Sequence, residues 1–320
     1  MTGVTGQDGL FLAELLTEKG YEVFGLVRRT YDPRCATVRA TVPGIQLMEG
    51  DLRDARSLRG VIDAVSPHEV YNLAGFSQVG LSWEEAELAT DVTGLGVLRI
   101  LEALRGHTSG NMERVRFYQA SSSEMFGGPR ESPQNELTAF HPRSPYGVAK
   151  AFAHHMTINF RESYGAYACC GILYNHESPR RAPTFVTRKI TRAAARISLG
   201  LQQELVLGDI DIRRDWGHAI DYVNAMWLMM QASEPGDYIV ATGETHSLRE
   251  LLSIAFSRVG IEDWKPLVRQ DPSLFRPADV TNLVGDSSKA RALLNWRPTR
   301  SFEEIILEMV DADLVLESSE

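Results

Sequence analysis

The sequence predicts an α/β fold in which a doubly wound parallel sheet is followed by a smaller C-terminal domain. Three observations support this prediction: a glycine-spaced loop opens the chain, short apolar runs then alternate with stretches of helical periodicity, and the alternation becomes irregular after about residue 170. The length of 320 residues exceeds the limit of about 250–300 for one hydrophobic core, so we expect two closely joined domains. Such a sheet places its site at the carboxyl ends of the strands.

The opening segment MTGVTGQDG carries glycines at positions 3, 6 and 9, followed by a helical apolar pattern that ends at Gly20. Glycines at this spacing allow a tight turn and let the backbone approach a pyrophosphate at a helix N-terminus, as in a Rossmann fold. A loop of another kind is the alternative, since the glycine pattern alone is weak. Only Met1 and Thr2 stand where the central first strand should precede the loop, so we expect upstream residues to be absent from this sequence.

Four further strands are expected at residues 21–27, 45–48, 68–73 and 115–120, with a helix at 95–104 before the last of them. The first of these strands ends in Arg28 and Arg29, where dinucleotide folds that prefer NAD have an acid for the ribose hydroxyls. Arginine at this place suits a 2′-phosphate instead, although a solvated charge pair is the alternative. The strand at 45–48 leads to Asp51, which could contact an adenine.

The second half of the chain has a different pattern. Residues 175–183 are polar and rich in helix breakers, and residues 185–199 have the pattern of a basic amphipathic helix. A helix at 216–230 is expected to pack back on the first domain. We therefore predict a cofactor-binding Rossmann domain over residues 1–170, with returning segments near 209–240, and a mostly substrate-binding domain over residues 171–320.

Composition argues against several classes of protein. The net charge of −9 argues against a nucleic-acid surface, because phosphate binding needs a basic face. No apolar run approaches the roughly 20 residues of a membrane span. Cys35, Cys169 and Cys170 have no metal-ligand spacing, and the adjacent pair cannot readily form a disulfide. With no signal peptide, these features predict a cytoplasmic protein without a metal or a membrane partner.

A hydride-transfer site is predicted from two motifs. Ser122 and Glu124 lie in YQASSSEMFG, and Tyr146 and Lys150 lie in SPYGVAK. A tyrosine four residues before a lysine shares its helical face, so we expect the ammonium to lower the phenol pKa from about 10 toward working pH. The phenolate would then be the base for a sugar hydroxyl, and Glu124 a second proton-transfer group. Alternatively, the serines are only polar residues at the end of a strand, and Glu124 is a carboxylate that the helix dipole favours at the start of a helix.

Ten segments carry a resemblance to a known family: TGVTGQDG, VRR, GDL, YQASSSEMFG, PRSPYGVAK, NHESPRR, FVTRK, RRDWGHAIDYV, ATGETHSLRE and FRPADV. On these segments the chain resembles the extended short-chain dehydrogenases/reductases, and within them the GDP-mannose 4,6-dehydratase family over essentially its whole length. The combination of NHESPRR, FVTRK and RRDWG is far more specific than the glycine loop. The resemblance implies a lyase of nucleotide-sugar metabolism that acts in deoxysugar biosynthesis.

The resemblance also implies which residues bind the ligands. The catalytic residues would be Ser122, Glu124, Tyr146 and Lys150. NADP would be bound by Gly3, Val4, Thr5, Gly6, Gln7, Asp8, Gly9, Arg28, Arg29, Asp51, Leu52, Leu73, Ala74, Gly75, Ser77, Lys150, His176 and Arg181. GDP-mannose or a related GDP-sugar would be bound by Ser82, Asn175, Val186, Lys189, Arg214 and Arg276. Arginine and lysine suit a diphosphate, whereas a structural His176 and an ordinary loop residue at Arg276 are the alternatives.

The implied reaction is a dehydration by internal hydride transfer. Tyr146 would take the proton of the sugar 4-hydroxyl, with Ser122 orienting that hydroxyl, while hydride moves from C4 to NADP. The resulting 4-ketone acidifies C5, so Glu124 would remove the C5 proton, water would leave from C6, and the hydride would return to C6. The resemblance therefore implies no net consumption of NADPH.

Departures from the family pattern leave alternatives open. Gly75, Phe76 and Leu88 differ from the family near the expected nicotinamide and sugar. A dehydratase of another GDP-sugar such as a heptose, or a nucleotide-sugar reductase or 4-epimerase, is therefore an alternative, and a non-catalytic NADP-binding protein is a third. The resemblance also implies a homo-oligomer, a tetramer before a dimer, with the arginine-rich loop at 28–39 in the interface.

Overall fold

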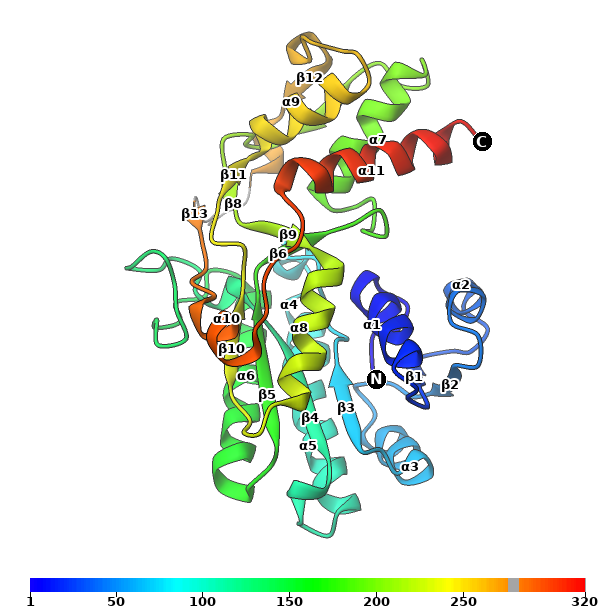
Figure 1. Cartoon of the computed structure of the whole chain (residues 1–320), viewed down its shortest axis with the longest axis vertical. Coiled ribbons are helices and arrows are strands. Elements are labelled where there is room, and N and C mark those ends of the chain that lie inside the picture. The colour runs from blue at the N-terminus through cyan, green and yellow to red at the C-terminus, as the bar shows by residue number, and fades with distance from the viewer. Residues whose placement is uncertain (276–281, 320) are drawn as a thin grey trace.

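The computed structural model describes residues 1–275 and 282–319. The molecule is elongated, with a lower part built on a β-sheet and an upper part dominated by helices (Figure 1). The N-terminus lies at the sheet, whereas the C-terminus lies at the end of the last helix of the upper part. No helix in the described ranges combines the length and the apolar character that crossing a membrane requires.

Parallel strands form the sheet of the lower part. They are β1 (Phe24–Val27), β2 (Gln46–Glu49), β3 (Glu69–Asn72), β4 (Arg116–Ser122), β5 (Ala168–Leu173) and β10 (Asp237–Val240). The strands β10, β5, β4 and β3 follow one another as parallel neighbours, and β1 pairs in parallel with β2. The predicted parallel sheet is therefore confirmed, although β1 and β3 are shorter than the apolar runs suggested.

Thr2 stands where the central strand was expected. It forms parallel bridges to Leu26 of β1 and to Asn72 of β3, and so joins the two ladders. The Thr2 hydroxyl donates to Oδ1 of Asn72 at 2.7 Å and accepts from the backbone N–H groups of Leu73 and Ala74 at 3.1 and 3.0 Å. One residue thereby holds the carboxyl end of β3 beside the start of the glycine loop.

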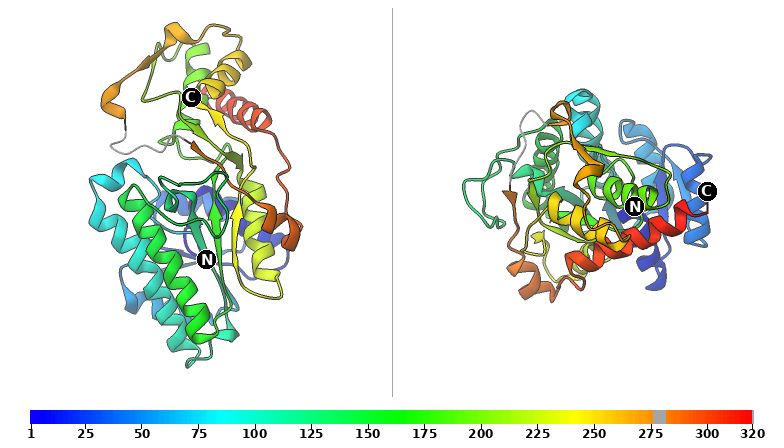
Figure 2. Two further views of the ribbon diagram at one scale, coloured as in Figure 1. Left: turned by 90° about the vertical axis from the view of Figure 1, so that its left-hand side faces the viewer. Right: turned by 90° about the horizontal axis from the view of Figure 1, so that it is seen from above.

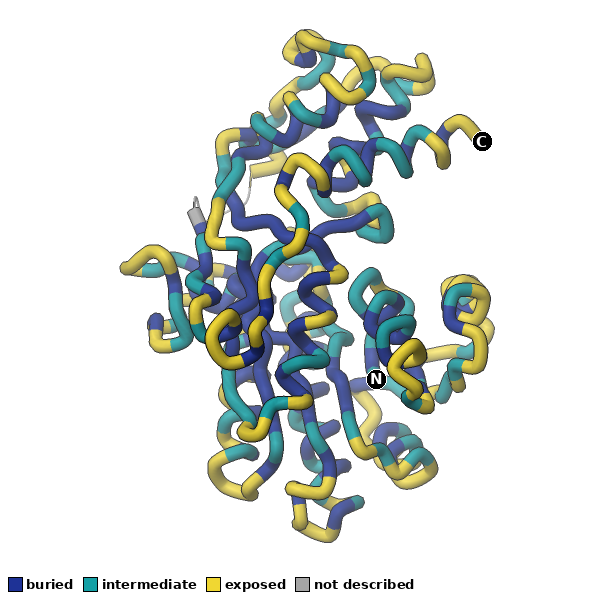
Figure 3. Tube along the Cα trace, in the orientation of Figure 1, coloured by how far each residue is buried: buried dark blue, intermediate teal, exposed yellow. Residues whose placement is uncertain are grey.

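Helices cover both faces of the sheet. On one face α1 (Gln7–Glu18) packs with α8 (Ala219–Gln231), and on the other lie α3 (Ala55–Val65), α5 (Gly96–His107) and α6 (Pro145–Tyr164). Figure 2 shows α5 and α6 side by side along the second face. The strands β3, β4, β5 and β10 and the inner sides of these helices are mostly buried, whereas exposed residues gather at the turns and at the periphery (Figure 3).

The upper part has a hydrophobic core of its own. The helices α7 (Val186–Ser198), α9 (Leu248–Arg258) and α11 (Phe302–Glu317) pack around buried side chains such as Leu251, Phe256 and Ile306. The remaining α-helices and strands of the described chain are α2 (Pro33–Thr41), α4 (Ala86–Thr90), α10 (Ser288–Leu294), β6 (Asn175–Glu177), β7 (Leu205–Leu207), β8 (Arg213–Arg214), β9 (Trp216–His218), β11 (His246–Ser247), β12 (Val268–Gln270) and β13 (Asn282–Leu283).

Three segments differ from the elements that the sequence predicted. Residues 216–218 form β9, which pairs in parallel with β6, so the helix expected at 216–230 begins only at Ala219. After the upper part, α10 and Trp296 return to the lower part, where α10 packs with α8 and β10 and Trp296 contacts Tyr222 of α8. Within the loop expected at 28–39, Asp32 caps helix α2 and Pro33 is its first residue, as these residue types favour.

Helix α11 is anchored to α7 by a buried carboxylate. Asp313 accepts hydrogen bonds from Nε of Arg188 and from the Thr191 hydroxyl, both at 2.7 Å. We expect Asp313→Ala to lower the free energy of unfolding by about 3–5 kcal/mol, because Arg188 then stays buried without its counter-charge. Urea denaturation measures this loss. The matched control is Asp311→Ala, which removes an exposed ion pair with Arg258, and an equally small effect of both changes would contradict the prediction.

Candidate active site

A cavity of about 1000 Å³ lies at the carboxyl ends of the strands and extends to the upper part. A parallel sheet is expected to carry its site at this edge, where loops after successive strands meet. Most residues that the sequence singled out line this cavity: Gly3, Thr5, Gly6, Asp8, Arg28, Arg29, Asp51, Leu52, Leu73, Ala74, Gly75, Ser77, Ser122, Glu124, Tyr146, Lys150, Asn175, His176, Arg181, Val186, Lys189 and Arg214. The fold thus brings residues from both halves of the chain to one place.

The glycine loop has the tight geometry that its spacing predicts. Gly3 has a φ of +72°, which favours glycine, and its carbonyl oxygen accepts from the N–H of Gly6 at 3.0 Å. A Cβ atom at Gly9 would collide with the backbone of Gly3. The loop therefore closes against the start of α1 and leaves backbone exposed to the cavity.

Three of the predicted cofactor contacts lie behind the loop instead of in the cavity wall. Val4 is fully buried in the core of the lower part, and Gly9 packs against Gly3. Gln7 donates through Nε2 to the His176 carbonyl at 3.1 Å and accepts from the Ser178 hydroxyl at 2.8 Å. These residues are absent from the described lining of the cavity, so the structure supports a role in shaping the loop.

Ser82 and Arg276 are two further residues that were predicted to contact substrate, and the structure describes only the first of them. Ser82 is fully buried and is absent from the cavity lining among the described residues. Its hydroxyl donates to the Val79 carbonyl at 2.6 Å and accepts from the N–H of Tyr146 at 3.3 Å. Ser82 therefore holds the first turn of α6, and its predicted contact with substrate stays a prediction. Arg276 lies outside the described residues.

The predicted catalytic residues come from the end of β4 and the start of α6. Ser122 ends β4, and its hydroxyl accepts from the N–H of Glu124 at 3.2 Å. Helix α6 begins after Ser144, whose side chain caps it by accepting from the N–H of Gly147 at 3.1 Å. This cap brings Tyr146 to the cavity beside Ser122, with which its phenol forms a hydrogen bond.

Burial dominates the ionisation of the tyrosine and the lysine. It raises the pKa of Tyr146 to about 12, and the hydrogen bond with Ser122 offsets only part of this rise. It also lowers the pKa of Lys150 to about 8. Nζ of Lys150 donates to the Ala120 carbonyl at 2.6 Å and lies 5.7 Å from the centre of the Tyr146 ring. In this structure the phenol pKa is therefore raised and not lowered toward working pH, and an effect of Lys150 on it stays a prediction.

A partly buried ion pair joins the end of the glycine loop to β6. Oδ2 of Asp8 lies 2.8 Å from Nε2 of His176, and Nδ1 of His176 lies 2.8 Å from the Tyr174 carbonyl. Burial opposes both charges, but their attraction lowers the pKa of Asp8 and raises the pKa of His176 overall. The His176 ring also stacks on Tyr222, with the ring centres 4.4 Å apart. His176 thus has a structural contact as well as a place in the cavity wall.

This ion pair predicts a pH-dependent stability. The raised pKa of His176 contributes stability that is complete below its unfolded value near 6.5 and is lost as pH rises through the folded value. The lowered pKa of Asp8 contributes stability that is lost as pH falls through its folded value. We expect His176→Gln to lower the free energy of unfolding by about 1.5–3 kcal/mol at pH values between the folded pKa of Asp8 and the folded pKa of His176. The loss should be smaller at lower and at higher pH. Urea denaturation of both proteins across pH tests this, and a constant difference would contradict it.

A protein-family model described as GDP-mannose 4,6 dehydratase matches residues 1–309. The chain belongs to this family. It is 51% identical over 332 residues to GDP-mannose 4,6 dehydratase 1 of Arabidopsis thaliana, covering 100% of this chain and 90% of that protein. It is 46% identical over 340 residues to GDP-mannose 4,6 dehydratase of Homo sapiens, covering 99% of this chain and 91% of that protein. The predicted family membership is confirmed.

Solved structures confirm the Rossmann fold of this member of the GDP-mannose 4,6-dehydratase family. The UDP-glucose 4-epimerase of Thermus thermophilus, in complex with NAD, is 29% identical with a TM-score of 0.83, covering 98% of this chain and 97% of that chain. DesIV of Streptomyces venezuelae, a dTDP-glucose 4,6-dehydratase with NAD and TYD bound, is 24% identical with a TM-score of 0.84, covering 97% and 95%. The second likeness concerns the fold alone.

In this family member, three cations from different segments line the upper end of the cavity. Arg181 lies 3.7 Å over the Phe185 ring, Lys189 donates through Nζ to the Val206 carbonyl at 2.7 Å, and Arg214 donates through Nη1 to the Arg213 carbonyl at 2.8 Å. Each cation is oriented by backbone or by an aromatic ring. Their convergence suits an anionic ligand such as a diphosphate.

Sequence reasoning did not single out several residues of the cavity wall. Arg53 lines it next to Asp51, with which it forms an ion pair at 2.9 Å. Glu177 and Thr187 line it from β6 and α7. Glu177 lies within NHESPRR and Thr187 within FVTRK, so the specific segments could have indicated them. Phe76 and Leu88, noted only as departures from the family, also line the cavity.

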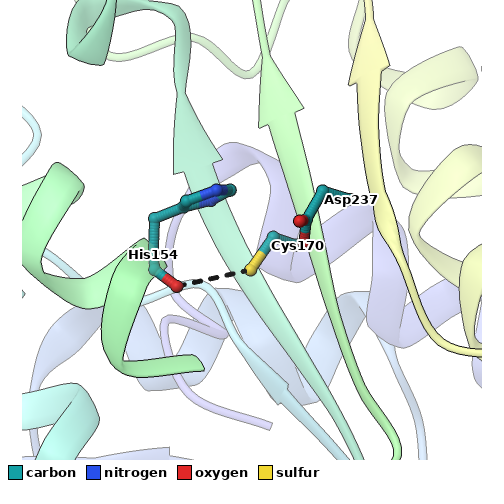
Figure 4. A group of neighbouring side chains, drawn as sticks. All are labelled: His154, Cys170 and Asp237. Carbon is teal, nitrogen blue, oxygen red and sulfur yellow. Dashed lines mark hydrogen bonds between the residues drawn. The ribbon is translucent and has the colours of Figure 1, made fainter. Parts of the chain in front are cut away.

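Among the described residues, the fold brings together one group of side chains of the types that bind metals, which sequence spacing did not predict. Ligand atoms of His154, Cys170 and Asp237 lie within 4.8 Å of one another (Figure 4). Both oxygens of Asp237 accept from Arg161, at 3.0 and 2.9 Å, and burial raises the pKa of the Cys170 thiol. Because the carboxylate is already neutralised and the thiol stays protonated, the group favours a structural link between α6, β5 and β10 over a metal centre.

Proposed function

We propose that this protein dehydrates GDP-mannose to GDP-4-keto-6-deoxymannose with NADP as its bound cofactor. The observation that supports this most is the meeting of Ser122, Tyr146, Lys150 and Glu124 in one cavity. The first three suit oxidation of a carbinol, and the additional carboxylate suits removal of a proton next to the new ketone. The cations of the upper end suit the diphosphate of a nucleotide sugar.

The glycine loop and the two arginines after β1 fit a phosphorylated dinucleotide. The loop is tight enough for backbone to approach a pyrophosphate at the start of α1. Arg28 and Arg29 are exposed and line the cavity, which favours NADP over NAD through its 2′-phosphate. When bound, the nicotinamide would accept a hydride from C4 of the sugar and supply it again to C6.

Different side chains of this protein carry out the successive proton transfers. Tyr146 takes the proton of the 4-hydroxyl as phenolate, so the phenol pKa that burial raises must be lower when the positively charged nicotinamide is bound beside it. Ser122, which bonds the phenol, orients that hydroxyl. The ketone formed at C4 acidifies the hydrogen at C5. Glu124, directly after the strand end, removes the C5 proton and passes it to the C6 hydroxyl, which leaves as water. Return of the hydride to C6 would be accompanied by transfer to C5 of the proton that Tyr146 took from the 4-hydroxyl, which gives the 6-deoxy product.

A related GDP-sugar such as a heptose is the second candidate substrate. Gly75, Phe76 and Leu88, which depart from the family pattern, line the same cavity as Tyr146. They form part of the same cavity wall, so they favour a test of more than one GDP-sugar. The proposed reaction class does not depend on this choice.

The function is tested by incubating the purified protein with GDP-mannose and NADP and detecting products by mass. We expect loss of one water with no net change in NADPH. In a parallel incubation with NADPH in place of NADP, net oxidation of NADPH would indicate a reductase, and unchanged mass with epimerised sugar would indicate a 4-epimerase. Unchanged GDP-mannose together with dehydration of a GDP-heptose would overturn the mannose assignment.

The organisation of the protein is part of the same proposal. Residues 1–170 would bind the cofactor and residues 171–320 mostly the substrate, with α8 and β10 as returning segments. We further propose a cytoplasmic homo-oligomer, a tetramer with a dimer as the alternative, in which segment 28–39 contacts a neighbouring subunit. Light scattering of the wild type and of an Arg29→Glu variant tests that interface.

A further inference from the structure

Glu177 is a buried carboxylate in the cavity wall that the proposed reaction does not use. It ends β6, directly after His176, and its side chain is 2% exposed. Burial raises its pKa. A carboxylate in such a place is costly unless nearby groups compensate its charge, so its neighbours indicate what it does.

Two neighbours approach the same oxygen of Glu177. The Thr187 hydroxyl, from the first turn of α7, donates to Oε2 at 2.6 Å. Nε of Arg181 lies 3.1 Å from that oxygen, in an ion pair whose geometry makes no hydrogen bond among the described residues. The Phe185 ring lies 3.7 Å from the guanidinium. Glu177 and Phe185 thereby restrict Arg181, and Thr187 restricts Glu177.

Arg181 shares the cavity wall with residues of both parts of the molecule. It lines the cavity together with Asp8 and Tyr146 of the lower part and Lys189 of the upper part. Its charge lowers the pKa values of Asp8 and Tyr146, so its field reaches both the glycine loop and the catalytic phenol. The position of this one guanidinium therefore affects the ionisation of groups at both the glycine loop and the catalytic tyrosine.

We propose that Glu177, oriented by Thr187, is a positioning residue that holds the Arg181 guanidinium in the cavity for a ligand phosphate. The proposal rests on the proposed function only in that both expected ligands carry phosphates. An arginine in a fixed orientation binds a phosphate more tightly than a mobile one, because less conformational freedom is lost on binding. The phosphate belongs either to the dinucleotide or to the GDP-sugar, and binding experiments distinguish the two.

The test compares binding of NADP and of GDP, measured separately by titration calorimetry, in the full chain. We expect Glu177→Gln to weaken binding of one of these ligands about tenfold. Thr187→Val should weaken the same ligand by a smaller factor, whereas Thr187→Ser keeps the hydroxyl and should restore wild-type affinity. Weaker NADP binding assigns the phosphate to the dinucleotide, and weaker GDP binding assigns it to the substrate.

A double-mutant comparison separates positioning from a general structural effect. In an Arg181→Ala background, Glu177→Gln should cause little further loss of affinity, because the group that it positions is gone. With GDP-mannose as substrate, Glu177→Gln should raise KM more than it lowers kcat if GDP is the affected ligand. Should Glu177→Gln not fold, the Thr187→Val and Thr187→Ser pair still decides.

The proposal is overturned if Glu177→Gln weakens nucleotide binding as much in the Arg181→Ala background as it does in the wild type. It is equally overturned if neither NADP nor GDP binding changes in folded Glu177→Gln, or in folded Thr187→Val where Glu177→Gln does not fold. Its failure can be told from that of the proposed function, because nucleotide affinities are measured without turnover. A wild type that binds both nucleotides but leaves GDP-mannose unchanged refutes only the reaction.

Discussion

Tyr146→Phe is expected to lower kcat by about 10²–10⁴-fold, because the phenol is the base proposed for the sugar 4-hydroxyl. The ring keeps its place in the wall, since the change removes only an oxygen that bonds Ser122. We therefore expect folding and nucleotide binding to be retained. Steady-state kinetics with GDP-mannose, together with NADP titration, measures both quantities.

Tyr118→Phe is a matched control for the tyrosine. Tyr118 is fully buried in β4, and its hydroxyl has no hydrogen-bond partner among the described residues. It is also absent from the described lining of the cavity. The control should turn over at the wild-type rate. Wild-type activity in Tyr146→Phe itself would exclude the phenol as the base.

Glu124→Gln is expected to stop dehydration at the ketone. The amide occupies the same space as the carboxylate but cannot accept the C5 proton, so loss of water should slow by about 10²–10⁴-fold. Oxidation at C4 does not need Glu124, so one equivalent of reduced nicotinamide should accumulate in a single turnover. Rapid mixing followed by absorbance, with mass detection of the sugar nucleotide, measures the two steps separately.

The control for this change is Glu131→Gln, which neutralises an exposed carboxylate in the segment after β4. It should leave both steps unchanged. Solvent deuterium provides a further readout, because the wild type should exchange the C5 hydrogen during turnover and Glu124→Gln should not. Normal release of water by Glu124→Gln would assign the C5 proton to another group.

The alternation of apolar runs and helical periods was sufficient to predict the parallel sheet. Neighbouring residues suffice to predict each of these elements, because short β-branched and apolar stretches favour strands and Gly20 favours the end of α1. The same local chemistry predicts the glycine loop, since a positive φ at Gly3 requires no knowledge of the rest of the fold. Boundaries were less well predicted, because β9 is a strand only through its pairing with β6.

The sequence predicted which residues line the candidate site more accurately than it predicted which atoms these residues contact. Spacing placed Tyr146 and Lys150 on one helical face, and both line the cavity. Spacing could not show that Lys150 donates to the Ala120 carbonyl or that Ser82 faces Tyr146 and not the cavity. Those outcomes depend on which backbone groups of other segments lie within hydrogen-bond distance.

The sequence by itself determined the fold class, the shape of the glycine loop and the segments that carry the family resemblance. These are properties of neighbouring residues, because dihedral preference and helical or strand periodicity act over a few positions. Only the tertiary structure decided that burial raises the pKa of Tyr146, that Asp8 pairs with His176, and that Glu177 restricts Arg181. Desolvation and charge pairing depend on distances between segments far apart in the chain, and those distances exist only in the folded protein.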